Sequence, residues 1–493
     1  MDGSSTRAPG ERPLRIAIIG AGLSGIMGAI KLHEAGIDDV VVYEKASSLG
    51  GTWRDNRYPG IACDIPSHFY SYSFAPNPDW SRQYASGEEI LAYIERVARD
   101  FDVARCIRFS EEVQRLTFDE GRWQIETARG TRDVADVVIA ATGVLHHPNV
   151  PDLPGLSRFQ GAAFHTARWD PSVAIDGRRV GVIGTGSTAV QLVSALVGRV
   201  EKLSLFQRTA QWISPQENFP FSDEDRATFR RDPEALRKKR ENIARKFVQK
   251  FSDVLIDSGS GALQGIEETC RQYLESEVKD PVLRERLRPT YRAACKRLVI
   301  SPDFYQAIQH PSAELVTDGI DRIEPEGVRT RDGRLHELDV LVFATGFRSD
   351  RFLRPMDVRG REGRSLDEAW AKRPSAYLTV AIPGFPNLFM LNGPNGPVGN
   401  YPLIDVAELQ MQYILQLVAL LKSGACRALS PREEAAARFE EERVTAARST
   451  VWMTGCTSWY LDDRGVPSTW PWTIERFRQQ LAAPELDAYE QLR

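Results

Sequence analysis

Two glycine-rich segments of the 493-residue chain have residue types and spacing that suit phosphate binding. They read Gly20-x-Gly22-x-x-Gly25 and Gly184-x-Gly186-x-x-Ala189. Glycine lets the backbone turn sharply there, so that its N–H groups approach a pyrophosphate at the start of the following helix. Each segment follows a β-branched apolar stretch and precedes a helical pattern, which is the context that a dinucleotide fingerprint requires. The chain is therefore expected to bind two dinucleotides.

The residue that lies 24 positions after the first glycine differs between the two segments. Glu44 holds this place in the first segment, and a carboxylate there accepts hydrogen bonds from ribose hydroxyls, which suits FAD or NAD. Arg208, followed by Thr209, holds it in the second, and a guanidinium binds a phosphate through charge-assisted hydrogen bonds. The pair predicts a flavoprotein that takes a hydride from NADPH. The alternative is one functional site beside a decayed duplicate.

The cysteines bear on what receives the electrons. Disulfide reductases that share a two-nucleotide plan need a CxxC or CxxxxC pair near the flavin, and this chain has neither. The scattered cysteines are interpreted as reduced thiols of a cytosolic protein, not as a disulfide framework or a zinc site. An oxygenase is the main remaining route. The six cysteines are Cys63, Cys106, Cys270, Cys295, Cys426 and Cys456.

The segment FQGAAFHTARWD lies between the two fingerprints, where a linker is expected. Its spacing resembles the signature of type I Baeyer–Villiger monooxygenases, whereas the sister flavin-containing monooxygenases end that motif with Tyr and a basic residue. The resemblance implies that the linker couples domain movement to cofactor state and performs no bond chemistry. A plainer interpretation is a packed linker whose histidine caps a turn. The motif residues are Phe159, Gly161, His165, Trp169 and Asp170.

A second motif of the same family is matched by GGTWRDNRYPGIACD, residues 50–64. Gly51 would let this loop lie against the flavin, Trp53 offers a flat apolar wall, and Asp64 is an acid close to apolar neighbours. An exposed loop carboxylate is the alternative for Asp64. Asp55 departs from the family, because an aromatic residue is common there.

The segment CKRLVISPDFY resembles the Lys-Arg pair of this family. By that resemblance Lys296 joins Arg208 at the NADPH 2′-phosphate, and Arg297 reaches the flavin. A Lys-Arg pair alone is usually solvated surface charge. TSWYL resembles the family's C-terminal loop, in which Trp459 would contact NADP. The resemblance also implies cofactor contacts at Thr52, Tyr70, Val113, Thr185, Ser187, Thr188 and Ile404.

The resemblance implies an FAD- and NADPH-dependent monooxygenase that converts a ketone into an ester or lactone through a flavin C4a-peroxide. Arg297 would stabilise the negative charge of the peroxide and of the attacked oxygen, and Asp64 would orient Arg297. FAD would be bound non-covalently. The alternatives are oxidation of nitrogen or sulfur, an uncoupled NADPH oxidase, and a flavoprotein that binds both nucleotides without catalysis.

The elements that position these residues predict an α/β fold with two Rossmann-like domains and a helical insertion in the second. Each domain opens with a fingerprint and closes with a buried strand that ends in Ala-Thr-Gly. The long apolar runs suit parallel strands that are covered on both faces. The expected division is an FAD-binding domain at 1–148 and 377–493, an NADP-binding domain at 149–221 and 291–376, and a helical insertion at 222–290.

The composition and charge of the chain limit the classes of partner that it is expected to bind. The net charge of −4 gives no overall basic field for nucleic acid or anionic lipid. The basic run LRKKRENIARKFVQKF spaces Ile243, Phe247 and Phe251 four apart, which predicts a helix with one apolar stripe and a solvated basic face. The polar residues 1–15 are expected to form a flexible tail. No apolar run is expected to approach the ~18 residues that span a bilayer, so a cytoplasmic protein is predicted.

Overall fold

Each glycine fingerprint lies at the carboxyl end of the central strand of a parallel five-stranded sheet. The computed structural model describes residues 13–399 and 401–492; residues 1–12 of the predicted tail lie outside them. The first sheet has the order β19-β7-β1-β2-β3. Its strands are β1 (Ile16–Ile19), β2 (Val40–Tyr43), β3 (Ile107–Arg108), β7 (Val137–Ala140) and β19 (Leu388–Met390). The central strand β1 pairs with β2 and β7.

The second sheet repeats this plan in the order β8-β17-β9-β10-β13. The strand β9 carries the second fingerprint, as β1 carries the first, and β17 takes the place of β7. The predicted α/β fold with two Rossmann-like sheets is confirmed. The strands are β8 (Ala162–His165), β9 (Arg179–Ile183), β10 (Lys202–Phe206), β13 (Ala313–Val316) and β17 (Val340–Phe343).

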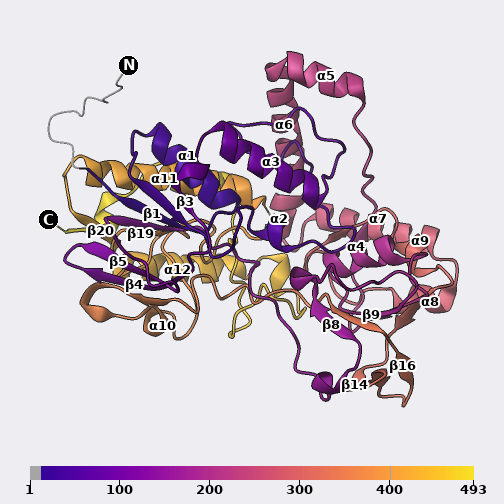
Figure 1. Cartoon of the computed structure of the whole chain (residues 1–493). Helices are drawn as coiled ribbons and strands as arrows, with labels where there is room; N and C mark the ends of the chain where they lie inside the picture. The colour runs from indigo at the N-terminus through magenta and orange to yellow at the C-terminus, as the bar shows by residue number, and fades with distance from the viewer. Residues whose placement is uncertain (1–12, 400, 493) are drawn as a thin grey trace.

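Both faces of each sheet are covered, which explains the continuous apolar runs. In β1, Ile16 and Ile18 face a core formed with helices α1 (Leu23–Glu34), α3 (Gly87–Asp100) and α11 (Leu403–Lys422). Ala17 and Ile19 face the opposite core, which a smaller sheet covers. That sheet contains β4 (Val113–Asp119), β5 (Arg122–Thr127), β6 (Arg132–Ala135) and β18 (Asp357–Arg359). Figure 1 shows α11 beside α1 along one face of the first sheet.

The second sheet has the same arrangement. Val180 and Val182 face a core with α4 (Ser187–Leu196) and α9 (Phe304–Ile308). On the other face, Leu341 and Phe343 pack against the antiparallel strands β14 (Ile320–Glu324), β15 (Gly327–Thr330) and β16 (Leu335–Glu337). Outside the segment 222–290, the other α-helices and strands are α2 (Thr52–Asp55), α10 (Leu366–Ala369), α12 (Glu433–Ala447), α13 (Ile474–Gln480), β11 (Ile213–Ser214), β12 (Val299–Ile300), β20 (Ala428–Pro431) and β21 (Tyr489–Leu492).

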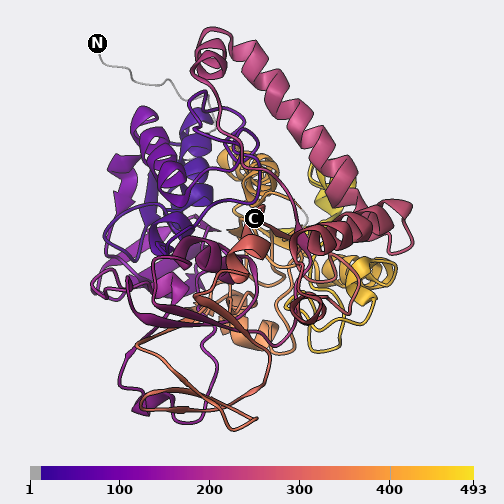
Figure 2. The same ribbon diagram turned by 90° about the vertical axis from the view of Figure 1, so that its right-hand side faces the viewer.

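The segment 222–290 is helical and contains α5 (Asp223–Arg231), α6 (Pro233–Phe247), α7 (Gly261–Glu277) and α8 (Pro281–Arg286). Figure 2 shows α6 as a long rod along one side of the molecule. Its stripe residues Ile243 and Phe247 pack against the core of the first sheet, and Phe247 contacts the ring of Phe69. The charged side of α6 is exposed, as at Arg237 and Lys238.

Two details differ from the sequence expectations. Residues 353–376, expected in the NADP-binding segment, join the core of the first sheet, because β18 pairs with β4 and Trp370 packs in that core. The helix α11 is long and apolar enough to cross a membrane, which corrects the expectation that no segment approaches that length. More than half of its apolar window is buried inside the protein, where it packs on α1.

Candidate active site

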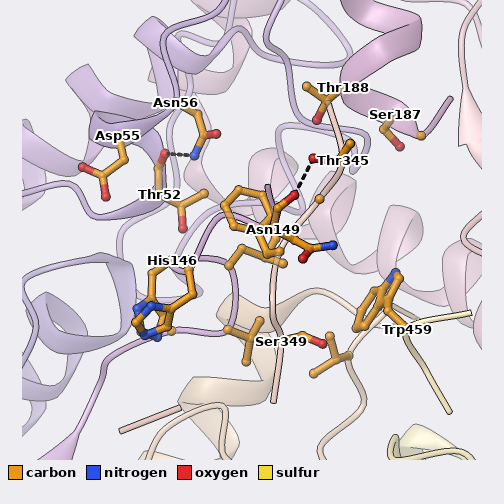
Figure 3. Close-up of a pocket in the computed structure, with 18 of the residues that line it drawn as sticks. Thr52, Asp55, Asn56, His146, Asn149, Ser187, Thr188, Thr345, Ser349 and Trp459 are labelled. Carbon is orange, nitrogen blue, oxygen red and sulfur yellow. Dashed lines mark hydrogen bonds between the residues drawn. The ribbon is translucent and has the colours of Figure 1, made fainter. Parts of the chain in front are cut away.

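A cavity of 1190 Å³ opens where the carboxyl ends of the two parallel sheets face each other. Pockets for a single drug-sized ligand have about 300–1,000 Å³, so this space suits more than one ligand group. Figure 3 shows residues from distant parts of the chain around the cavity, with Thr52 and Asn56 on one side and Trp459 on the other. The Asn56 side-chain amide donates to the Thr52 carbonyl at 2.9 Å, which closes the end of the short helix α2.

Each fingerprint forms a concave backbone turn, here called a nucleotide cradle, which a side chain in place of its first glycine would fill. The first cradle is formed by residues 20–25 and the second by residues 184–189. Gly20 has φ +105°, and a Cβ there would lie 2.6 Å from the carbonyl oxygen of Ala141. Gly184 has φ +121°, and a Cβ there would lie 2.3 Å from the carbonyl oxygen of Ala344. Each alanine begins the Ala-Thr-Gly that closes its sheet, so the two sites share one geometry. Gly25 does not line the cavity; it packs against the carbonyl oxygen of Gly20.

The helices α1 and α4 begin at these cradles. Their N-caps are Gly22 and Gly186, and neither residue makes a side-chain cap hydrogen bond. The first backbone N–H groups of a helix without such a cap are available to an anion. Both glycines line the cavity, so the local structure fits the pyrophosphates of two dinucleotides.

Glu44 is buried at the end of β2, on the cavity wall. Its carboxylate accepts hydrogen bonds from the backbone N–H groups of Ala21 at 2.8 Å and Ala46 at 2.9 Å. The Arg54 guanidinium donates to it at 3.1 Å. Sequence reasoning missed Arg54, which forms an ion pair with this carboxylate beside the first cradle.

Arg208 and Lys296 bring two cations to the second cradle. Arg208 is exposed at the end of β10, and both side chains line the cavity with Thr209. Burial lowers the pKa of Lys296, and the charge of Arg208 lowers it further. The Lys296 ammonium lies 4.8 Å from the ring centroid of Tyr291. Two cations that destabilise each other are stabilised by a bound anion, so this corner of the cavity suits a phosphate.

Arg297 and Asp64 form a two-pronged ion pair inside the same cavity. The Arg297 Nε donates to the Asp64 carboxylate at 3.0 Å and Nη2 donates at 2.7 Å, and Nη1 donates to the Gly399 carbonyl at 3.3 Å. Burial lowers the pKa of Arg297, but the charge of Asp64 and the neighbouring Tyr460 outweigh burial and raise it. The guanidinium is thus a fixed, permanent positive charge.

Short strands hold Arg297 in place. The strand β12 begins two residues after it, and the Val299 N–H donates to the Trp212 carbonyl at 3.1 Å. Asp64 lies in the loop after α2, and the indole N–H of Trp53 in α2 donates to the hydroxyl of Tyr70 beyond Asp64 at 3.2 Å. Sequence reasoning singled out the TSWYL segment for Trp459 and missed its Tyr460, which only its buried position beside Arg297 distinguishes from other aromatic residues.

The predicted cofactor residues converge on this one cavity, apart from Gly25. Those that line it are Gly20, Gly22, Glu44, Gly51, Thr52, Trp53, Asp64, Tyr70, Val113, Gly184, Thr185, Gly186, Ser187, Thr188, Arg208, Thr209, Lys296, Arg297, Ile404 and Trp459. Among the residues that the structure describes, no group of His, Cys, Asp and Glu could hold a metal ion.

The predicted fingerprint linker is part of the second sheet and does not line the cavity. Residues 162–165 form β8, which pairs with β17. The Nδ1 atom of His165 accepts a hydrogen bond from the Ala167 N–H at 3.1 Å, so Nε2 carries the proton that bonds the Gly346 carbonyl at 3.0 Å. Gly346 borders the cavity. His165 therefore caps a turn and also joins the linker to the second Ala-Thr-Gly.

The other residues of this motif have structural contacts. A Cβ at Gly161 would lie 2.3 Å from the Asp339 carbonyl oxygen and 2.7 Å from the ring of Phe159. Trp169 packs edge-on against Phe164 at 5.0 Å between ring centroids. The Asp170 carboxylate accepts hydrogen bonds from the N–H and hydroxyl of Ser172.

Cys295 and Cys456 form a disulfide, which corrects the expectation that all six cysteines are reduced thiols. Spacing along the chain could not reveal the pair, because the two residues lie 161 positions apart and meet only when the loops that carry them pack together. Their Cα atoms are 6.1 Å apart, within the range that a disulfide requires.

Comparison with known proteins agrees with this geometry. Residues 13–222 match the FMO-like family, described as flavin-binding monooxygenase-like. A Baeyer–Villiger monooxygenase of Streptomyces coelicolor is 40% identical over 488 residues, covering 97% of this chain and 93% of that protein. This chain belongs to the type I Baeyer–Villiger monooxygenases.

A second relative and a solved structure are also similar to this chain over nearly its whole length. An uncharacterized monooxygenase of Mycobacterium tuberculosis is 45% identical over 477 residues, covering 96% of this chain and 95% of that protein. The crystal structure of cyclohexanone monooxygenase from Rhodococcus sp. Phi1 bound to NADP⁺ is similar with a TM-score of 0.87 and 32% identity, covering 97% of this chain and 99% of that one. This Baeyer–Villiger monooxygenase is therefore an NADPH-dependent flavoprotein that uses FAD and NADP, as predicted.

Proposed function

We propose that this enzyme inserts one oxygen atom of O2 into a ketone and gives an ester or lactone. The observation that carries the proposal is the Arg297–Asp64 ion pair, which lines the same cavity as the two nucleotide cradles. A fixed cation is needed where negative charge develops on an attacked carbonyl oxygen. Oxidation of nitrogen or sulfur makes less demand on such a cation.

The residues of the first cradle suit FAD and those of the second suit NADPH. Gly20, Gly22 and the start of α1 would hold the FAD pyrophosphate, and Glu44 would accept hydrogen bonds from its ribose. Arg208, Thr209 and Lys296 would bind the 2′-phosphate of NADPH. When bound and reduced by NADPH, the flavin supplies the activated form of O2.

Arg297 would stabilise the negative charge of the reacting oxygens, and Asp64 would orient it. The bidentate contact fixes the plane of the guanidinium and leaves Nη1 on a weaker contact of 3.3 Å to Gly399. Trp459, 44% exposed on the C-terminal loop, would cover NADP and help to exclude water. The cavity that Arg297 lines is also lined by Phe247, Tyr401 and Leu403, which suits an apolar ketone.

The test is product analysis of a ketone panel, with NADPH consumption measured in parallel. We expect Arg297→Ala to keep NADPH oxidation and release hydrogen peroxide, while ester formation falls about 10²–10³-fold, the usual effect of removing one preorganised donor. Arg292→Ala is the matched control, because Arg292 precedes it by five positions and pairs with Glu267 outside the cavity.

Two outcomes would contradict the proposal. If Arg297→Ala makes ester at the rate of the wild-type enzyme, the cation does not serve this reaction. If the wild-type enzyme oxidises a thioether but no ketone in the panel, its activity is the oxidation of nitrogen or sulfur and not the oxidation of ketones.

A further inference from the structure

The disulfide joins two segments that both end at the cavity. Cys295 immediately precedes Lys296 and Arg297, and Cys456 lies three positions before Trp459. All three of these downstream residues line the cavity. A single covalent bond therefore links the segment that carries the cations to the loop that carries the exposed indole.

The surroundings of the two cysteines differ from those of the loop beyond them. Cys295 is fully buried and Cys456 is 7% exposed, in a cluster with Trp212, Trp452 and Tyr460. Trp459 lines the cavity and is 44% exposed. Figure 3 shows its side chain among the cavity residues. The ring of Trp459 lies 4.2 Å from that of the buried Tyr460, so the bond anchors a loop whose exposed tip rests on a buried base.

We propose that Cys295 and Cys456 are a site of reversible oxidation by hydrogen peroxide, and that the oxidised form holds the C-terminal loop over the NADP site. The inference rests on the proposed function for its oxidant, because an oxygenase whose site admits water releases hydrogen peroxide. Cytosolic disulfides, where they occur, are usually transient and redox-sensing or catalytic.

The chemistry balances with two thiols and one peroxide. One thiolate attacks a peroxide oxygen, the O–O bond breaks, and a sulfenic acid and hydroxide form. The second thiolate attacks the sulfenic sulfur and expels a second hydroxide as the S–S bond forms. The two protons of the thiols convert the hydroxides into water, and the two electrons that the two thiolates lose in forming the S–S bond reduce the peroxide. A dithiol or phosphine returns both sulfurs to thiols.

Oxidation of the Cys295–Cys456 pair would limit the release of hydrogen peroxide from the active site. A loop that is fixed before NADP binds has less conformational freedom to lose, so NADP binds more tightly to the oxidised form. An open loop admits water and produces peroxide, and the peroxide then closes the dithiol. The direction of the effect is therefore set: reduction weakens NADP binding, and oxidation restores it.

The experiment compares the two redox states of the FAD-loaded enzyme. Protein isolated without reductant is alkylated and digested, and we expect mass spectrometry to find the peptides of Cys295 and Cys456 linked. NADP⁺ affinity is measured by calorimetry before reduction with a phosphine, after it, and again after hydrogen peroxide. We expect reduction to weaken binding on the order of tenfold, a usual coupling between sites, and peroxide to restore it.

The control variants separate this pair from the other thiols. Cys270 is buried in the same cluster but is not part of the disulfide, so Cys270→Ser should behave like the wild-type enzyme. Cys456→Ser should stay at the weaker affinity whatever the treatment. If that variant does not fold, the three states of the wild-type enzyme decide alone.

Two results would overturn the inference. Recovery of the two peptides unlinked after peroxide would show that the dithiol is not oxidised. If the two peptides are linked but the oxidised and reduced enzymes bind NADP⁺ with equal affinity, the disulfide does not influence the loop. Neither the peptide mapping nor the NADP⁺ titration uses a ketone. The redox inference can therefore be supported when the proposed ketone oxidation is refuted, and it can be refuted when that oxidation is supported.

Discussion

At position 208 a single side chain gives the second nucleotide cradle a chemistry opposite to that of the first. Glu44 and Arg208 end equivalent strands, β2 and β10, yet one is a buried carboxylate with three donors and the other an exposed cation. Because the backbone geometry of the two cradles is the same, the choice between cofactors depends on these side chains.

We expect Arg208→Ala to raise KM for NADPH far more than KM for NADH, because only NADPH carries the 2′-phosphate. The loss of one charge-assisted hydrogen bond is worth about 1.5–3 kcal/mol, or roughly ten- to a hundredfold in KM. Steady-state kinetics with both nucleotides measure the difference. Arg199→Ala, whose guanidinium pairs with Asp176 away from the cavity, is the control. Equal increases for both nucleotides would refute the phosphate role.

Gly161 illustrates a motif residue that serves packing. We expect Gly161→Ala to lower the free energy of unfolding by about 1–3 kcal/mol, the usual cost of overpacking, because its Cβ would lie 2.3 Å from the Asp339 carbonyl. Gly265→Ala, inside α7 with no atom within 4 Å of its Cβ, should raise it by about 1 kcal/mol. Denaturant unfolding of both variants makes the comparison. A Gly161→Ala protein as stable as wild type would show that β8 shifts to accept the methyl group.

At the scale of elements, a partly buried ion pair adds to the apolar packing of Ile243 and Phe247 that holds the insertion to the first sheet. Arg240 of α6 pairs with Asp405 of α11, and the Tyr401 hydroxyl donates to the same carboxylate at 3.2 Å. Burial raises the pKa of Asp405, and Arg240 acts against that shift. Tyr401 also lines the cavity, so this contact connects the position of α6 with the shape of the site.

We expect Arg240→Met to destabilise the enzyme by about 3–5 kcal/mol at neutral pH, because the buried Asp405 carboxylate loses its cation. Arg237→Met removes an exposed pair on the same helix and should have little effect. The midpoint of thermal unfolding reports the difference. If the two variants unfold at the same temperature, α6 is not held by this pair.

The elements themselves could be predicted from sequence because their signals are local. The β-branched runs, the glycine fingerprints and the stripe of α6 each lie within one short window, and the equal offset of Glu44 and Arg208 reflects one strand–helix–strand unit used twice. The contacts that complete the site are not local. Asp64 and Arg297 are 233 positions apart, and only the family resemblance brought them together before the structure did. The family resemblance did not indicate the ion pair of Arg54 with Glu44 or the disulfide, so neither contact was predicted.

At the scale of the whole molecule, stability in acid depends on histidines that are buried uncharged. His68 lies 4.8 Å from the ring of Phe221 and 4.9 Å from that of Phe229, so it joins the first sheet's loops to the insertion. Burial, and then the charge of Lys239, lower its pKa to about 4. Burial also lowers the pKa of His146, at the cavity, to about 4.

The folded enzyme should therefore lose stability as pH falls from about 6.5 to about 4. An unfolded histidine titrates near 6.5, so between these values the unfolded chain binds more protons than the folded one, and the full stability is present only above this window. Each of the two histidines accounts for roughly 3 kcal/mol at the acid end. His68→Phe keeps the ring contacts and removes the proton site, so its thermal midpoint should fall less than that of the wild-type enzyme between pH 7 and pH 4.5. Parallel curves for the two proteins would mean that His68 is protonated without cost, and that the contact between the insertion and the first sheet does not exclude the charged ring.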